Sequence, residues 1–152
     1  MVKMKHLIAA LFVASASFSY AADTTPSSSA SSWQAEAQKE IKAKNYDGAI
    51  KTLLAANEPN SADWNNLLGY AQRKKSPPDL NAAERYYQAA LKIDPKHKGA
   101  LEYYGELFLM KNDLPGAEQM LARLNKVCIF SCEEYRDLKE EIAKYKAKKG
   151  SK

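Results

Sequence analysis

The sequence repeats itself at a step of 34 residues, and this step constrains the fold more than any other feature. Within each repeat the matching positions are spaced by three, four and three residues, so they share one face of a helix. A small residue at the second position lets a neighbouring helix approach closely, and the larger residue at the third fills the space between helices. The pattern predicts a helix that packs in the same way three times. The matching sets are Tyr46, Leu80 and Leu114; Ala49, Ala83 and Ala117; Leu53, Tyr87 and Leu121; and Ala56, Ala90 and Leu124.

A second helix is expected before each of these. The expected ranges are Trp33–Lys44, Asp63–Lys75 and Lys98–Lys111. Turn residues follow each range, and prolines lie in the loops between repeats. The middle repeat contains Ser76-Pro77-Pro78, which we interpret as a two-residue insertion in a loop. A strict 34-residue step would instead align Ala37, Ala71 and Gly105, and either register gives the same architecture.

Helix pairs that repeat every 34 residues are typical of tetratricopeptide repeats, and the chain resembles that family over about residues 33–126. The first repeat departs from the family pattern at Glu36 and Ala37, where leucine and glycine are common. The resemblance implies an all-α solenoid of about three helix-turn-helix repeats that binds a protein or peptide partner. It is carried by Gly69-Tyr-Ala, Ala83-Glu-Arg-Tyr-Tyr-Gln-Ala-Ala-Leu-Lys-Ile-Asp-Pro95, Gly105-Glu-Leu-Phe108 and Ala117.

The last repeat needs a cap, because a stacked repeat cannot cover its own outer face. Residues 128–147 are expected to form a cap turn and a capping helix, and residues 148–152 a basic tail. Ser131, with Glu134 three residues later, has the pattern of a helix N-cap. The expected apolar side of this helix consists of Tyr135, Leu138, Ile142 and Tyr145.

The N-terminus has the pattern of a secretory signal peptide. Lys3 and Lys5 precede an apolar run over residues 7–18, and small residues follow at Ser19 and Ala21. The run is too short to span a bilayer comfortably. We expect cleavage after Ala21, a flexible polar leader over residues 22–32, and an exported protein, periplasmic or secreted, without a stable membrane anchor.

The residues that carry chemistry are few. His97 is the only histidine after the signal peptide, and we expect it to be an exposed loop residue. One histidine and two cysteines cannot form the common zinc sets, and nucleophile motifs and glycine-rich phosphate loops are absent from the sequence. We therefore expect a binding module rather than an enzyme, without cofactor, metal or nucleic-acid partner; the oligomeric state stays open.

Cys128 and Cys132 form the one reactive pair. An even cysteine count in an exported protein favours a disulfide, which here would link the last repeat to its capping helix. The alternative is a thiol-redox or copper-binding pair, because a helix begins nearby and helix N-termini lower thiol pKa values. The sequence resembles small exported proteobacterial repeat proteins with a C-terminal Cys-x-x-x-Cys.

The first helices of such repeats line a concave surface, where ligands bind. Their outward positions place amides at one end, a cation with a tyrosine in the middle and carboxylates at the other end. We predict a scaffold or adaptor that binds its partner in this groove, whereas the pairs Tyr86-Tyr87 and Tyr103-Tyr104 pack mainly in the core. The candidate groove residues are Gln38, Asn66, Tyr70, Arg73, Glu102, Glu106 and Met110.

Overall fold

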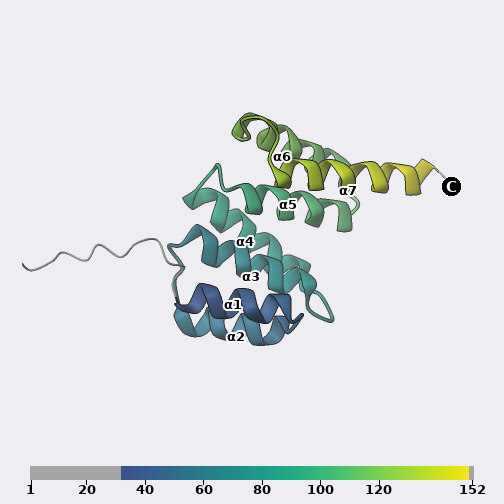
Figure 1. The fold of residues 1–152 in the computed structure, drawn as a ribbon. Coiled ribbons are helices and arrows are strands. Elements are labelled where there is room, and N and C mark those ends of the chain that lie inside the picture. Colours follow the sequence, from purple (N-terminus) through teal and green to yellow (C-terminus); the bar gives the residue numbers. More distant parts are fainter. Residues whose placement is uncertain (1–31, 151–152) are drawn as a thin grey trace, which may run out of the picture.

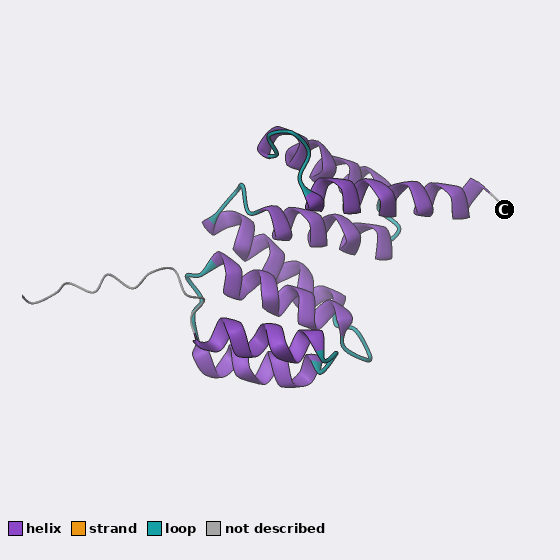
Figure 2. Ribbon diagram, viewed as in Figure 1, coloured by secondary structure: helices purple, strands orange, loops and turns teal. Residues whose placement is uncertain are grey.

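The computed structural model describes residues 32–150, which form seven helices arranged as a stack of pairs (Figure 1). Within this range the chain contains helices and loops but no strand (Figure 2), which confirms the predicted all-α repeat solenoid. The predicted signal peptide and most of the leader lie outside the described residues. The helices are α1 (Ser32–Lys42), α2 (Tyr46–Ala56), α3 (Ala62–Lys74), α4 (Leu80–Ile93), α5 (Lys98–Met110), α6 (Leu114–Val127) and α7 (Glu133–Gly150).

The second helix of each pair starts with the same cap. Asn45, Asp79 and Asp113 each accept a hydrogen bond from the backbone N–H three residues later, over 3.1, 2.8 and 2.9 Å. Such a cap typically stabilises a helix by about 1 kcal/mol. The three caps keep the 34-residue step, so they fix where α2, α4 and α6 begin.

The first helices follow a different step because one linker is longer. Residues 75–79 join α3 to α4, whereas the equivalent linkers, 43–45 and 111–113, are two residues shorter. This confirms the predicted insertion at residues 76–78. Ala37, Gly69 and Gly105 are therefore equivalent, and the strict 34-residue alignment of the first helices is wrong.

The first helices end slightly earlier than predicted, at Lys42, Lys74 and Met110. In the two short linkers, Lys44 and Asn112 adopt φ values of 58° and 61°. This left-handed conformation cannot continue a right-handed helix, so the chain turns there.

The predicted close contacts between helices are present. Ala49, Ala83 and Ala117 are fully buried, as is Tyr87. A Cβ atom on Gly69 would lie 2.7 Å from Cε1 of the Tyr87 ring, which is closer than atoms pack. Glycine in α3 therefore makes room for the tyrosine of α4.

The buried residues form two clusters rather than one continuous core. One cluster joins the first pair to α3 and contains Ala37, Leu53, Trp64 and Leu68. The other extends from α4 to α7, from Ala83 to Ile142. The larger share of the buried apolar surface therefore lies in the C-terminal half.

Helix α7 packs against α5 and α6 through Leu138 and Ile142, which are buried as predicted. Two expectations for this region are wrong. The helix begins at Glu133, so Ser131, with φ of 60°, lies outside it and is not the N-cap; the Cys132 carbonyl accepts the backbone N–H of Arg136 instead. The helix also continues to Gly150, so the described part of the basic tail is helical.

Candidate functional site

The three first helices place equivalent residues in rows across one face of the stack. Most of the predicted groove residues fall into these rows, although Met110 aligns with Lys42 and Lys74 rather than with Arg73. The rows are Gln34, Asn66 and Glu102; Gln38, Tyr70 and Glu106; and Ile41, Arg73 and Leu109.

A pocket of about 220 Å³ lies between α1, α3 and α5. We call it the apolar pocket. Tyr70 and Tyr103 form one wall, with ring centroids 4.8 Å apart, and the Tyr46 ring meets Tyr70 edge-on. The pocket is lined by Gln38, Ile41, Lys42, Leu67, Tyr70 and Tyr103.

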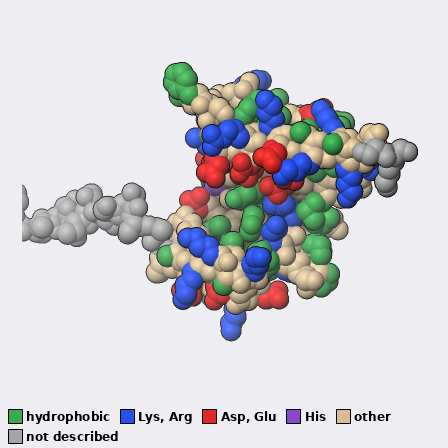
Figure 3. Space-filling model, turned by 45° about the vertical axis from the view of Figure 1, so that its right-hand side comes forward, with side chains coloured by type: hydrophobic (Ala, Val, Ile, Leu, Met, Phe, Trp, Pro, Cys, Tyr) green, Lys and Arg blue, Asp and Glu red, His purple; other side chains and the backbone are tan. Residues whose placement is uncertain are grey.

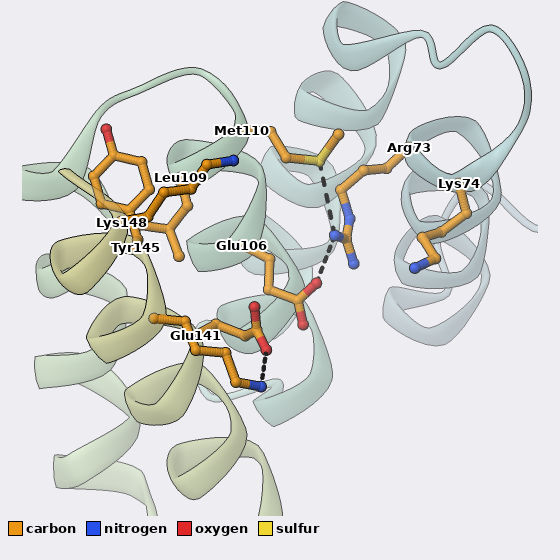
Figure 4. A pocket seen from close by; sticks show the side chains of 9 residues that line it. Arg73, Lys74, Glu106, Leu109, Met110, Glu141, Tyr145 and Lys148 are labelled. Carbon is orange, nitrogen blue, oxygen red and sulfur yellow. Dashed lines mark hydrogen bonds and ion pairs between the residues drawn. The ribbon is translucent and has the colours of Figure 1, made fainter. Parts of the chain in front are cut away.

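A second pocket, of about 420 Å³, lies between α3, α5 and α7 (Figure 4). We call it the charged pocket. Helix α7 contributes Glu141, Lys144, Tyr145 and Lys148, which share one helical face at spacings of three and four. The sequence reasoning placed the groove on the first helices and missed this wall. The spacing on α7 was visible, but its position opposite α5 was not. The other lining residues are Arg73, Lys74, Glu106, Leu109 and Met110.

Arg73 lies between the two pockets and is buried, with a side chain only 4% exposed. Its Nη1 pairs with Glu106 Oε2 at 2.5 Å, and its Nε donates a hydrogen bond to Tyr87 Oη over 3.3 Å. The guanidinium lies 5.5 Å from the ring centroid of Tyr70 and 5.7 Å from that of Tyr103. These contacts fix the cation and order the aromatic wall of the apolar pocket.

Two more of the predicted groove residues are buried. Glu102 and Asn66 are each 7% exposed, and the Asn66 Oδ1 has no hydrogen-bond partner. Burial, together with the neighbouring carboxylates of Glu106, Asp137 and Glu134, raises the pKa of Glu102 to about 8. At pH 7 the Glu102 carboxyl is therefore mostly protonated. Of the remaining candidates, Gln38 and Met110 are exposed, whereas Tyr70 and Glu106 are half-buried.

His97 is not the free loop residue that was expected. Its Nδ1 accepts the backbone N–H of Ala100 over 3.1 Å, so it caps α5 in the way that Ser61 caps α3. Its Nε2 lies 3.0 Å from Asp63 Oδ1, and the side chain is only 14% exposed. The need for an acceptor at the start of α5 explains the difference.

Cys128 and Cys132 are joined by a disulfide in the turn between α6 and α7. The bond leaves Ile129 and Phe130 projecting from the surface, 83% and 97% exposed. Within residues 32–150, no group of three or more His, Cys, Asp or Glu side chains is arranged to hold a metal ion. None of the helices in that range is both long and apolar enough to cross a membrane.

Comparison with known proteins agrees with the architecture. Residues 79–141 match the family model of the tetratricopeptide repeat, from the cap of α4 into α7. No curated protein matches the chain at a significant level. The matched segment contains the caps Asp79 and Asp113, the helices α4, α5 and α6, and the start of α7. Together with the pair formed by α1 and α2, these features agree with a tetratricopeptide-repeat solenoid.

Proposed function

We propose that the chain is a protein–protein interaction module that binds a segment of a partner protein along the face formed by α1, α3, α5 and α7. One observation carries this proposal: the apolar and charged pockets lie on the same face and share one cluster of side chains. Tyr70 and Tyr103 line the apolar pocket, and Arg73, which contacts both rings, lines the charged pocket. A single segment can therefore occupy both.

The chemistry of the two pockets defines what such a segment offers. The apolar pocket suits an apolar side chain that packs against Tyr70 and Tyr103. The charged pocket suits a polar group, because Lys74, Lys148 and Glu106 line it. Since Arg73 already orders the aromatic wall, binding loses little additional side-chain entropy.

The module is proposed to act as a scaffold or adaptor outside the cytoplasm, in the periplasm or beyond. The predicted signal peptide supports this location, and so does the Cys128–Cys132 disulfide, because such bonds persist in oxidising compartments. Mass spectrometry of protein recovered from the periplasm is expected to give an N-terminus at Ala22. A full-length chain confined to the cytosol would contradict the location but not the binding.

Site-specific photo-cross-linking in the producing cell tests the groove. A photoreactive amino acid at Gln38, which is exposed and lines the apolar pocket, is expected to capture a partner. The matched control replaces Gln119, which is exposed on α6 and lines neither pocket. Equal cross-linking from both positions, or cross-linking from position 119 alone, would show that the partner binds elsewhere.

A further inference from the structure

The charged pocket continues along α7 into a third pocket. This third pocket, of about 340 Å³, lies between the ends of α5 and α7. Because the two pockets share four lining residues, they form one groove, which we call the α5–α7 groove. Met110, which is 45% exposed, gives the groove an apolar surface. The shared residues are Leu109, Met110, Tyr145 and Lys148, and the third pocket adds Asn112 and Lys149.

The carboxylates that line this groove already have cationic partners. Glu106 pairs with the buried Arg73, and Glu141 pairs with Lys144 over 2.9 Å. Lys144 also pairs with Glu140, which lines neither pocket. A bound cation would therefore have to compete with an existing ion pair for each of these carboxylates.

Three lysines of the groove have no such partner. Within residues 32–150, Lys74, Lys148 and Lys149 are exposed and form no ion pair. The ammonium groups of Lys74 and Lys149 lie 5.9 and 5.6 Å from the ring centroids of Tyr70 and Tyr145, which leaves their charge uncompensated. Even with the carboxylate outside the groove counted, five cations face three carboxylates, a net charge of +2.

The lysines without ion pairs lie on opposite walls of the groove. Figure 4 shows Lys74 on the side of α3 and Lys148 on the side of α7, with Met110 of α5 between them. Helix α7 is acidic in its first turn and basic in its last. Figure 3 accordingly shows acidic side chains gathered across the middle of one face and basic side chains nearer the C-terminal end of the chain. The positive charge is therefore a local property of this end of the face.

We propose that the α5–α7 groove binds an acidic stretch of the partner, in which carboxylate side chains flank one apolar side chain. This inference rests on the proposed function and names the charge of the bound segment. The apolar side chain packs against Leu109 and Met110, and the carboxylates pair with Lys74 on one wall and Lys148 on the other. Ion pairs between exposed groups are individually weak, so the preference depends on several of them acting together.

Backbone-amide NMR of the folded protein tests the proposal with two peptides of the same shape. The probe is acetyl-Asp-Glu-Leu-Glu-Asp-amide, and its matched control is acetyl-Asn-Gln-Leu-Gln-Asn-amide. The acidic peptide is expected to bind at least about fivefold more tightly and to shift the signals of Met110 and Lys148. In about 1 M salt, where the screening length is about 3 Å, the difference between the peptides is expected to disappear.

Variants without the charge assign the preference to particular lysines. Lys148→Gln is expected to weaken binding of the acidic peptide by about two- to fivefold, and the double variant with Lys74→Gln by about fivefold or more. Neither variant is expected to change binding of the amide peptide. Lys51→Gln removes the same charge from an exposed position on α2, outside both pockets, and is expected to bind the acidic peptide like the wild type.

Equal affinity for the two peptides overturns the acidic preference. So does a Lys51→Gln protein that loses as much affinity as the Lys148→Gln protein, because net charge would then explain the binding. A single-stranded oligothymidylate that displaces the acidic peptide and binds more tightly overturns the proposal in favour of nucleic acid. These outcomes leave cross-linking from position 38 intact, whereas loss of that cross-linking contradicts the proposed function itself.

Discussion

Replacing Glu102 with glutamine is expected to change how the stability of the protein depends on pH. Glutamine has nearly the same shape but stays neutral, whereas the buried carboxyl of Glu102 must ionise as the pH rises. The folded-state pKa is about 8, against an ordinary value of 4.5. A carboxyl with a raised folded-state pKa contributes its full stability below pH 4.5 and loses it progressively up to about pH 8.

The size of the effect follows from that shift. Each unit of pKa difference corresponds to about 1.4 kcal/mol, so full burial of the charge would cost up to about 5 kcal/mol above pH 8. Glu102 keeps some contact with water, at 7% exposure, which lowers the cost. We expect the free energy of unfolding of E102Q to exceed that of the wild type by about 2–3 kcal/mol at pH 9 and by much less at pH 5.

Urea unfolding at pH 5, 7 and 9, followed by the circular dichroism of the helices, measures the difference. E58Q is the control, because Glu58 is exposed. A difference between E102Q and wild type that stays constant from pH 5 to pH 9 would show that Glu102 does not ionise against a burial cost. A wild type that gains stability over this range relative to E102Q would reverse the sign and refute the reasoning.

Three further substitutions test the packing, the buried cation and the disulfide. Ala83→Leu is expected to destabilise the stack by about 1–3 kcal/mol through overpacking, because Ala83 is fully buried; an unchanged melting temperature would contradict the assigned helix contacts. Arg73→Met should cost about 3–5 kcal/mol because it leaves Glu106 half-buried without its partner, and adding Glu106→Gln should recover part of that loss in a double-mutant cycle. Replacing Cys128 and Cys132 by serine should cost about 2 kcal/mol or less in urea unfolding, since the closed loop is short. If the double variant melts like the wild type but loses a cellular phenotype, or if the protein with free thiols binds copper stoichiometrically, the redox or copper-binding alternative becomes the better one.

The repeat architecture could be predicted because its determinants are local. Asn45, Asp79 and Asp113 cap three helices at one step, and buried alanines follow each cap at the same distance. The insertion was visible as consecutive prolines. These features depend on neighbouring residues along the chain, so the sequence alone carries them.

The burial of the groove residues and the role of α7 could not be predicted in the same way. Arg73 and Glu102 are charged residues on amphipathic helices, where such residues normally face water. Glu102 lies beside α7, which docks on α5 where a Cβ atom on Gly105 would overlap Leu138. Arg73 is buried by its contacts with Glu106 on α5 and Tyr87 on α4. Because α7 lines the charged pocket, the groove does not lie only on the first helices. Replacing Cys128 and Cys132 by serine is therefore expected to affect the charged pocket even where the apolar pocket is unchanged.

The division of the buried residues into two clusters implies that the two ends of the stack open independently. In stacked repeats each layer is held mainly by its neighbours, and weakly held layers exchange their amide protons sooner. The small cluster around Leu53 and Trp64 should therefore let α1 and α2 fray while α4 to α7 stay folded. A bound segment that contacts both α1 and α5 would hold the two clusters of buried residues together. Its clearest signature would be slower amide exchange in the N-terminal pair.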